Sequence, residues 1–394
     1  MSQHFLGLSA RPARSRIVWA VLILGVLLLL DRLPRATVAD PARAVWPASA
    51  VLPVGQPLMF KAGGRIPVPP GTPVAHASAL LAMPVSHPSE LLAFWFAGQR
   101  ESGADVQIAA SQFDRIKQQW SAARFVVNRH TLADQLGFGV RRLGNPVAWV
   151  DGQGRVHLFV VATGLGGWAA ARIVHLRQSH PAQDFAALSF DVERVLPLSW
   201  FWNKSFLVRT APLSLKDGGM VLPVHFEMGI KYPVALRFDA SGDFLGMVRI
   251  SSRKHLLQPA LLISDESRWL ALMRDQSLMG KVALAQTLDG GRHWNDLPDL
   301  TLHNPDSSVA ALALAPESMF LVHNSLPKGR SVLDLSASTD GQNWVLAQTL
   351  ARGAAHEEFS YPALAWAGNS LWASYTDQRQ AIAWQQFSFV APVR

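Results

Sequence analysis

The chain has 394 residues; 49% are hydrophobic, 16% are charged and none is cysteine. This composition allows a large buried core, and it excludes a globally disordered chain, a disulfide framework and thiolate metal sites. The formal net charge is +8, but residues 1–44 hold six of the 36 basic and two of the 28 acidic residues, so the remainder carries about +4. No basic run with interleaved aromatic residues occurs, and nucleic acid is therefore not an expected partner.

The first element is an unbroken apolar run, IVWAVLILGVLLLL, at residues 17–30. Arginines flank it on both sides: Arg11, Arg14, Arg16, Arg32 and Arg35. Basic flanks around a short apolar run are typical of a signal peptide or a signal anchor, which we predict for residues 1–35. We therefore expect a single-pass protein of the inner membrane with a periplasmic domain, or a periplasmic protein if cleavage follows a small residue such as Ala39 or Ala44. A buried helix of the main domain is disfavoured, because the run has no polar face.

Residues 36–55 are rich in Pro and Ala, which predicts a linker, and the folded domain is predicted to cover residues 56–394. That domain contains three sets of six short apolar runs with strand-like alternation. The first runs of the six units are residues 76–83, 145–151, 203–209, 258–264, 307–314 and 361–367. Six units of three to four antiparallel strands predict an all-β fold, a six-bladed β-propeller preceded by the N-terminal hydrophobic helix. A β-sandwich pair or a β-helix is the alternative, which six repeats of one blade length fit poorly.

One turn occurs twice, in TLDGGRHW (287–294) and in STDGQNW (338–344). Asp-Gly is a strong hairpin signal, because glycine accepts the positive φ that a tight turn needs. We expect each turn to join the third and fourth strands of a blade, with its Trp packed over that blade. Residues 56–63 are predicted to supply the missing fourth strand of the last blade, which closes the ring and protects its edges.

Four further stretches accompany these turns: residues 95–111, 203–227, 303–331 and 357–384. Together they resemble the sialidase (neuraminidase) superfamily, in its bacterial branch with degenerate BNR, or Asp-box, repeats. The resemblance covers roughly residues 75–390. It implies an exo-glycosidase, a hydrolase that retains the anomeric configuration of an acidic sugar by means of a Tyr nucleophile. It also implies a Glu that assists the Tyr, an Asp acid/base and three Arg that clamp the substrate carboxylate.

The resemblance assigns these roles to particular residues. Tyr361 stands where the family has its nucleophile, at the start of the last blade's first strand. Asp105, five residues after Arg100, matches the acid/base loop, and Arg274 and Arg330 match two of the clamp arginines.

Two positions depart from the family pattern. His76 stands where the first clamp Arg is usual, and Gln258 stands where the Glu partner of the Tyr is usual. A Gln side chain cannot take the proton of a phenol. Glu227, Glu357 and Glu358 are the carboxylates that can take its place.

The starts of the six first strands are polar or amphipathic: His76, Asn145, Asn203, Gln258, Ser307 and Tyr361. We predict that they converge on one face with Arg100, Asp105, Arg274 and Arg330. The catalytic candidates are thus Tyr361, Asp105 and Glu227. The candidates for substrate binding are Arg100, Arg274, Arg330, His76, Gln258, Asn203 and Lys204. The histidines show no metal-ligand spacing, and neither a metal nor a cofactor is expected.

The predicted function is an exported sialidase-like glycoside hydrolase acting on an acidic glycan or oligosaccharide. Two alternatives stay open. Gln258 and His76 favour a non-catalytic propeller that binds glycans, and a protein scaffold is the third possibility.

Overall fold

Each of the two Asp-Gly turns is held by hydrogen bonds within the turn. The Asp289 carboxylate accepts from the backbone N–H of His293 at 2.9 Å, and Thr287 Oγ1 accepts from the backbone N–H of Gly291 at 3.0 Å. Gly291 has a φ of 88°, which glycine adopts at little cost. Trp294 Nε1 donates to the Gly291 carbonyl at 3.2 Å, and the indole packs against the apolar cluster of its own blade, as predicted.

The second turn repeats the pattern. The Asp340 carboxylate accepts from the backbone N–H of Asn343 at 2.7 Å, and Ser338 Oγ accepts from that of Gly341 at 2.9 Å. Trp344 Nε1 donates to the Gly341 carbonyl at 3.0 Å. Both turns join the third and fourth strands of a sheet, which confirms the hairpins expected from the sequence.

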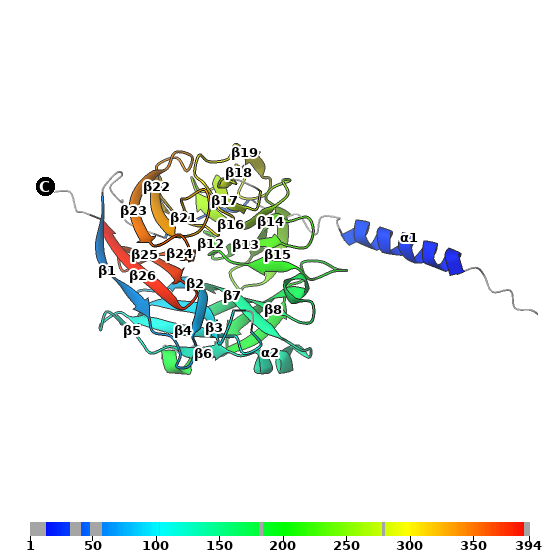
Figure 1. Ribbon diagram of the computed structural model, residues 1–394, viewed down its shortest axis with the longest axis horizontal. Helices are drawn as coiled ribbons and strands as arrows, with labels where there is room; N and C mark the ends of the chain where they lie inside the picture. The colour runs from blue at the N-terminus through cyan, green and yellow to red at the C-terminus, as the bar shows by residue number, and fades with distance from the viewer. Residues whose placement is uncertain are drawn as a thin grey trace, which may run out of the picture.

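The six sheets form a ring, as Figure 1 shows. The structure is a computed structural model that describes residues 13–31, 41–47, 57–101, 103–180, 184–277 and 280–389. Each sheet is antiparallel and has four or five strands, and neighbouring sheets contact one another around the ring. The predicted six-bladed β-propeller is therefore confirmed.

The first three blades span residues 74–249. The strands of blade 1 are β2 (Val74–Ala82), β3 (Ser89–Gly98), β4 (Gln107–Asp114), β5 (Gln119–Trp120) and β6 (Arg124–Val127). Those of blade 2 are β7 (Arg142–Val150), β8 (Val156–Thr163), β9 (Ala171–Gln178) and β10 (Phe190–Val195). Those of blade 3 are β11 (Phe206–Val208), β12 (Leu213–Ser214), β13 (Met220–Phe226), β14 (Tyr232–Phe238) and β15 (Phe244–Arg249).

The last three blades complete the ring. The strands of blade 4 are β16 (Leu256–Ile263), β17 (Trp269–Asp275), β18 (Ala283–Thr287) and β19 (Asn295–Leu297). Those of blade 5 are β20 (Ala310–Ala315), β21 (Ser318–Asn324), β22 (Val332–Ser338) and β23 (Val345–Arg352). Those of blade 6 are β24 (Phe359–Ala367), β25 (Ser370–Asp377), β26 (Ala381–Phe389) and β1 (Leu58–Ile66).

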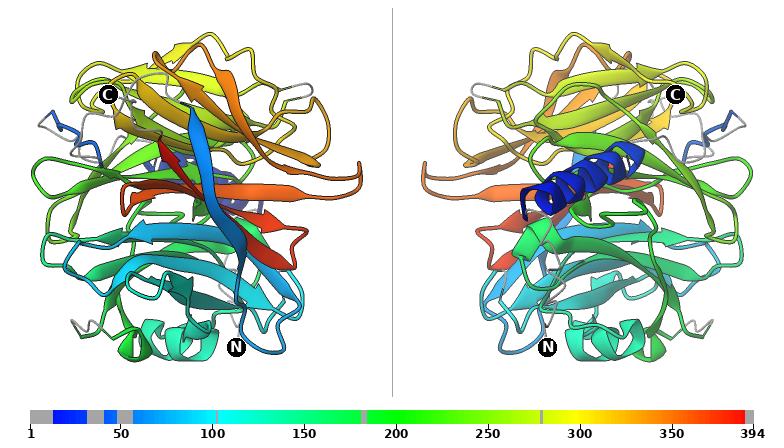
Figure 2. Two further views of the ribbon diagram at one scale, coloured as in Figure 1. Left: turned by 90° about the vertical axis from the view of Figure 1, so that its left-hand side faces the viewer. Right: turned by 90° about the vertical axis from the view of Figure 1, so that its right-hand side faces the viewer.

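Strand β1 comes from the other end of the chain and closes the ring. It pairs antiparallel with β26, from Leu58 opposite Phe389 to Ile66 opposite Ile382. Figure 2 shows the two strands side by side, one blue and one red. The predicted closing strand is thus confirmed, three residues longer at its C-terminal end than the sequence indicated.

The apolar core lies between neighbouring blades. One cluster joins blades 1 and 2, another joins blades 2 and 3, and a third joins blade 6 to blade 1. Fully buried tryptophans occupy second strands in three blades: Trp95, Trp269 and Trp372. Burial of such large side chains between the sheets fixes the blades relative to one another, and this rigid ring positions the loops at its ends.

Residues 41–47 lie in the predicted linker and pack against blades 3 and 4. Ala44 is fully buried, and its backbone N–H donates to the Glu266 carbonyl at 2.7 Å. The backbone N–H of Val45 donates to the Ser214 carbonyl at 3.1 Å. This stretch therefore contacts the propeller, whereas Ala39 and the rest of residues 36–55 lie outside the described residues.

Two helices lie outside the sheets. Helix α2 (Arg129–Leu136) connects blades 1 and 2, begins at Asn128, whose side chain caps two backbone N–H groups, and ends at Gly137 with φ of 69°. Helix α1 (Ala13–Asp31) projects from one side of the propeller in Figure 1. No helix in the described part of the chain is both long and apolar enough to cross a bilayer.

Candidate active site

The first strands of three blades bend at the same point. Asn145, Gln258 and Tyr361 have φ of 41°, 49° and 52°, and each precedes a proline. Strand pairing skips at each of these residues. Positive φ in residues other than glycine is costly, and such bulges re-aim side chains at functional sites. The sequence prediction that these three positions are equivalent agrees with this geometry.

In the other three blades, the residue with positive φ lies one or two positions away from the residue expected from the sequence. Positive φ falls on Ala77, Ser205 and Asp306, next to the expected His76, Asn203 and Ser307. None of these three residues precedes a proline, and the missing proline explains why the sequence alone did not fix the register.

Tyr361 is surrounded by nitrogen-bearing side chains. The centroid of its ring lies 4.3 Å from that of His76, and the Arg209 guanidinium lies 5.1 Å from the ring centre. The Tyr361 side chain also raises the pKa of Arg274. Blades 1, 3, 4 and 6 therefore each contribute to the surroundings of this phenol.

Arg274 is held by two polar side chains. Its Nε donates to the Asp306 carboxylate at 2.6 Å, and its Nη1 donates to Gln258 Oε1 at 3.2 Å. Burial lowers the pKa of Arg274, but Asp306 and Tyr361 raise it above its usual value. Gln258 thus contacts an arginine, where a glutamate would form an ion pair.

Arg330 and Glu358 extend this cluster through blades 5 and 6. Arg330 Nη1 donates to Glu358 at 2.9 Å, and its Nη2 donates to the Asp306 carbonyl at 2.7 Å. Arg379 Nε donates to the other Glu358 oxygen at 2.8 Å and pairs with Glu101 of blade 1. Burial alone would raise the pKa of Glu358, but hydrogen bonds from Arg379 and Ser360 and the charge of Arg330 lower it to about 2.

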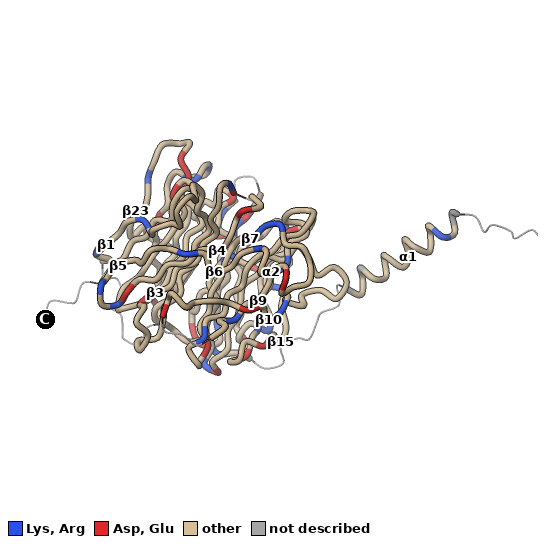
Figure 3. Tube along the Cα trace, turned by 90° about the horizontal axis from the view of Figure 1, so that it is seen from below, with Lys and Arg blue, Asp and Glu red and all other residues tan. Residues whose placement is uncertain are grey.

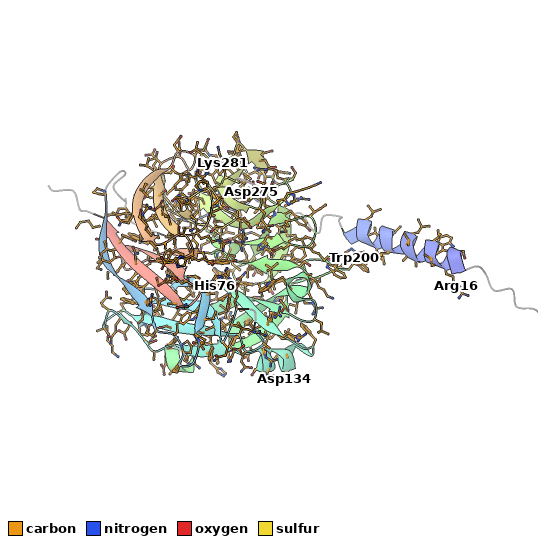
Figure 4. The ribbon with its side chains drawn as sticks, viewed as in Figure 1. Arg16, His76, Asp134, Trp200, Asp275 and Lys281 are labelled. Atoms are coloured by element: carbon orange, nitrogen blue, oxygen red, sulfur yellow. The ribbon has the colours of Figure 1, made fainter. Side chains whose placement is uncertain are left out.

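His76 is buried beside Tyr361. Neither ring nitrogen has a hydrogen-bond partner among the described residues. Burial lowers its pKa to about 3, and the positive charge of Arg379 contributes. The imidazole is therefore neutral at pH 7. Figure 4 labels His76 near the middle of the ring.

Glu227 lies at the end of the second strand of blade 3. Its carboxylate is 3.5 Å from Nε2 of the buried His225. Burial raises the pKa of Glu227, but His225 and the cations Lys231 and Arg274 bring it below its usual value. The carboxylate is therefore ionised and electrostatically linked to Arg274.

Asp105 and Arg100 are exposed on the loop between β3 and β4. The Asp105 carboxylate accepts a hydrogen bond from the backbone N–H of Gln99 in the same loop. The loop is tied to the Tyr361 cluster by the ion pair between Glu101 and Arg379.

Asn203 organises the loop before blade 3. Its Oδ1 accepts from the backbone N–H groups of Leu198 and Ser199, and its Nδ2 donates to the Leu196 carbonyl at 2.9 Å. Lys204 Nζ lies 4.9 Å from the Trp202 ring. These contacts are internal to the loop.

Three functional candidates were not found from the sequence: Arg209, Asp306 and Arg379. Arg379 follows a strand in an ordinary turn, and Arg209 sits in an apolar run. Their partners lie in other blades, so no local signal marks them. Asp306 follows an Asn-Pro pair, which indicates only a turn.

Hydrogen bonds through Asp306 and Glu358 join Arg274, Arg330 and Arg379 in one cluster, and Arg209 packs against Tyr361 beside it. Such an arrangement can bind an anion and hold a phenol against it. Figure 3 shows that basic and acidic residues are otherwise interspersed along the chain. Among the described residues, no group of His, Asp and Glu is arranged to hold a metal ion.

The ring of six blades, the Asp-box turns and the polar cluster at the axis define a propeller of the sialidase type. Residues 89–372 match the family model of the BNR repeat-like domain. Because this match covers more than half of the chain, the protein belongs to the BNR repeat-like family. No curated protein sequence matches the chain.

Solved structures show the same fold. The chain is similar to the Hadza microbial sialidase Hz136, with 16% identity and a TM-score of 0.64, over 80% of this chain and 66% of the other. Trypanosoma rangeli sialidase has 13% identity and a TM-score of 0.62, over 85% of this chain and 60% of its own. That enzyme is also known with the inhibitor DANA and with sialic acid. A protein of unknown function from Dyadobacter fermentans has 10% identity and a TM-score of 0.64, over 84% of this chain and 99% of its own. The chain thus spans about two thirds or less of the sialidases it matches.

Proposed function

We propose that the protein is a sialidase-like glycoside hydrolase that binds an acidic glycan at the axis of the propeller. The observation that supports this proposal is the packing of Tyr361 against His76 and the Arg209 guanidinium, next to Arg274, which Asp306 and Gln258 hold. Arg274 and Arg330 hold the sugar carboxylate. Family membership and the fold of the sialidases agree with this assignment.

In the proposed reaction, Tyr361 Oη attacks the anomeric carbon and Asp105 protonates the leaving oxygen. Water then cleaves the sugar–tyrosine bond with Asp105 as base, so that the configuration is retained. A phenol suits this task, because the substrate carboxylate at the anomeric carbon would repel an anionic nucleophile. Glu227 is the proposed acceptor of the phenol proton, since Gln258 cannot serve.

A second candidate function is glycan binding without turnover. Gln258 favours it, because an amide occupies the place where the family resemblance expects the carboxylate beside the nucleophile. Both functions require an acidic sugar at the axis.

The experiment is a pair of assays on the purified protein. Hydrolysis of a fluorogenic sialoside together with binding of DANA supports the hydrolase, and binding without hydrolysis supports the second function. If the protein neither binds nor cleaves any member of a panel of acidic glycans, both proposals are wrong.

For the N-terminal segment we propose export, with residues 17–30 as signal anchor or signal peptide. Its support is the apolar run, whose side chains are exposed, for example Ile17 at 62% and Trp19 at 65%. Fractionation of cells expressing the full chain tests it. Recovery only in the cytoplasmic fraction would contradict it.

A further inference from the structure

Arg209 occupies an unusual place in blade 3. The ladder pairs Val208 with Val224 and resumes with Leu213 opposite Val221, so four residues of the inner strand oppose two of its partner. Such a bulge redirects side chains. Arg209 lines the narrow cavity at the axis of the propeller.

The side chain crosses the axis to two other blades. Its Nη1 donates to the Ser78 carbonyl of blade 1 at 3.1 Å, and its Nη2 donates to the Pro362 carbonyl of blade 6 at 2.8 Å. Its Nε has no hydrogen-bond partner among the described residues. The residue is 2% exposed and lies against the ring of Tyr361.

Arg209 differs from the other arginines of the site in its charge balance. Arg274, Arg330 and Arg379 each pair with a carboxylate. No described carboxylate forms an ion pair with Arg209. Burial lowers its pKa to about 10, so it is still protonated at neutral pH. Burying an unpaired charge is costly, and such a cost is typical of functional sites.

We propose that Arg209 is a positioning residue that packs against the ring of Tyr361 and holds it in place. Arg209 also supplies a positive charge to the site, which His76 of blade 1 does not. The proposal rests on the proposed function, because its ligand is the anionic sugar bound above Tyr361. An anion placed there offsets the buried charge. Because the imidazole of His76 is neutral, it does not repel the guanidinium of Arg209, as a cation at that position would.

The test compares two substitutions that differ in charge. Arg209→Lys keeps the positive charge, and Arg209→Gln keeps a hydrogen-bond donor but is neutral. Calorimetric titration of the full chain with DANA should give affinities within about threefold of wild type for the lysine variant and at least about tenfold weaker for the glutamine variant. The control is Arg237→Gln, which removes another buried blade 3 arginine that pairs with Asp217. Its affinity should be unchanged.

The outcomes separate this inference from the proposed function. If wild type does not bind DANA, the inference is wrong, whereas the proposed function is wrong only if no acidic glycan of the panel is bound or cleaved. If wild type binds and both Arg209 variants lose affinity equally, Arg209 has only a structural role, through its hydrogen bonds to backbone carbonyls, and the inference is wrong. It is equally wrong if the glutamine variant binds as wild type does.

A measurement on the wild-type protein covers the case of a variant that does not fold. The Arg209 Nε–H correlation in an NMR spectrum should shift during titration with DANA, because this group lies beneath the ligand. A resonance that stays in place while DANA binds would overturn the inference.

Discussion

The rings of His76 and Tyr361 lie 4.3 Å apart, with an angle of 57° between their planes. His76 belongs to the first blade and Tyr361 to the last. The candidate site is therefore assembled across the seam where the ring closes, and its geometry depends on the pairing of β1 with β26.

Replacing Tyr361 with Phe should abolish turnover of a sialoside while DANA binding stays within about threefold, because only the hydroxyl is removed. Steady-state kinetics and calorimetry measure the two effects. Tyr375→Phe is the matched control, since the Tyr375 hydroxyl donates to the Leu350 carbonyl away from the cluster. Full activity of the Tyr361 variant would exclude the tyrosine as nucleophile.

Replacing Gln258 with Glu should raise kcat for a sialoside by about tenfold or more, the scale of general base catalysis. The new carboxylate can accept the phenol proton, and it keeps its contact with Arg274. Gln258→Ala serves as control and should not gain activity. An unchanged or lower kcat in the Glu variant would show that the amide does not limit the reaction.

Replacing Arg274 with Ala should weaken binding of an anionic ligand by about 1.5–3 kcal/mol, the usual value for a hydrogen bond to a charged group. Binding of DANA by calorimetry measures it. Arg177→Ala removes an arginine that pairs with Glu193 on blade 2, and its affinity should stay at the wild-type value. Equal losses in the two variants would point to a general electrostatic effect.

Acid should destabilise the interface between blades 2 and 3. His157 Nδ1 and His175 Nε2 are 2.8 Å apart, and His157 Nε2 contacts the Asp151 carboxylate at 3.2 Å. Burial lowers the pKa of His157, and it lowers that of His175 to about 2. The folded pKa of each histidine lies below the unfolded value of 6.5. The stability contributed by the neutral histidines is therefore complete above pH 6.5. It is lost as the pH falls below 6.5, because the unfolded chain then binds protons that the folded protein does not.

His175 should contribute a slope of about 1.4 kcal/mol per pH unit below pH 6.5, because its folded pKa of about 2 keeps it neutral while the unfolded histidine binds a proton. His175→Phe keeps the stacking on Phe159 and should make the slope shallower by that amount. Denaturant unfolding from pH 7 to pH 5 measures it. If the slope of the variant equals that of wild type, His175 does not bind a proton on unfolding.

Two N-terminal deletions should differ in stability. Removing residues 1–40 should leave the unfolding temperature of the propeller unchanged. Removing residues 1–47 also removes the buried Ala44 and its backbone hydrogen bonds, and it should lower the unfolding temperature by about 2–4 °C per kcal/mol lost. Calorimetric scans measure the difference. Equal temperatures would mean that residues 41–47 add no stability.

The blades and their Asp-box turns were predictable, because each depends on residues close in sequence. Helix α2 was missed even though Asn128 and Gly137 are its capping signals. Strand-like alternation, the pattern that marks the blades, does not reveal a single short helix between two of them.

The site was predictable only in part. Tyr361, Arg274 and Arg330 followed from the family resemblance, and the structure places them in one cluster. Arg209 was missed because its hydrogen bond to Pro362 joins residues 153 positions apart. A contact of that range depends on the shape of the whole ring and leaves no local pattern.

The pairing of Leu58–Ile66 with Ala381–Phe389 sets an order of events during synthesis. Among the strands of the propeller, β1 is translated first and β26 last, so blade 6 stays incomplete until residue 389 has been translated. A stop codon just before Ala381 would therefore leave every residue of the candidate site in place but would remove the strand with which β1 pairs, so that the ring stays open.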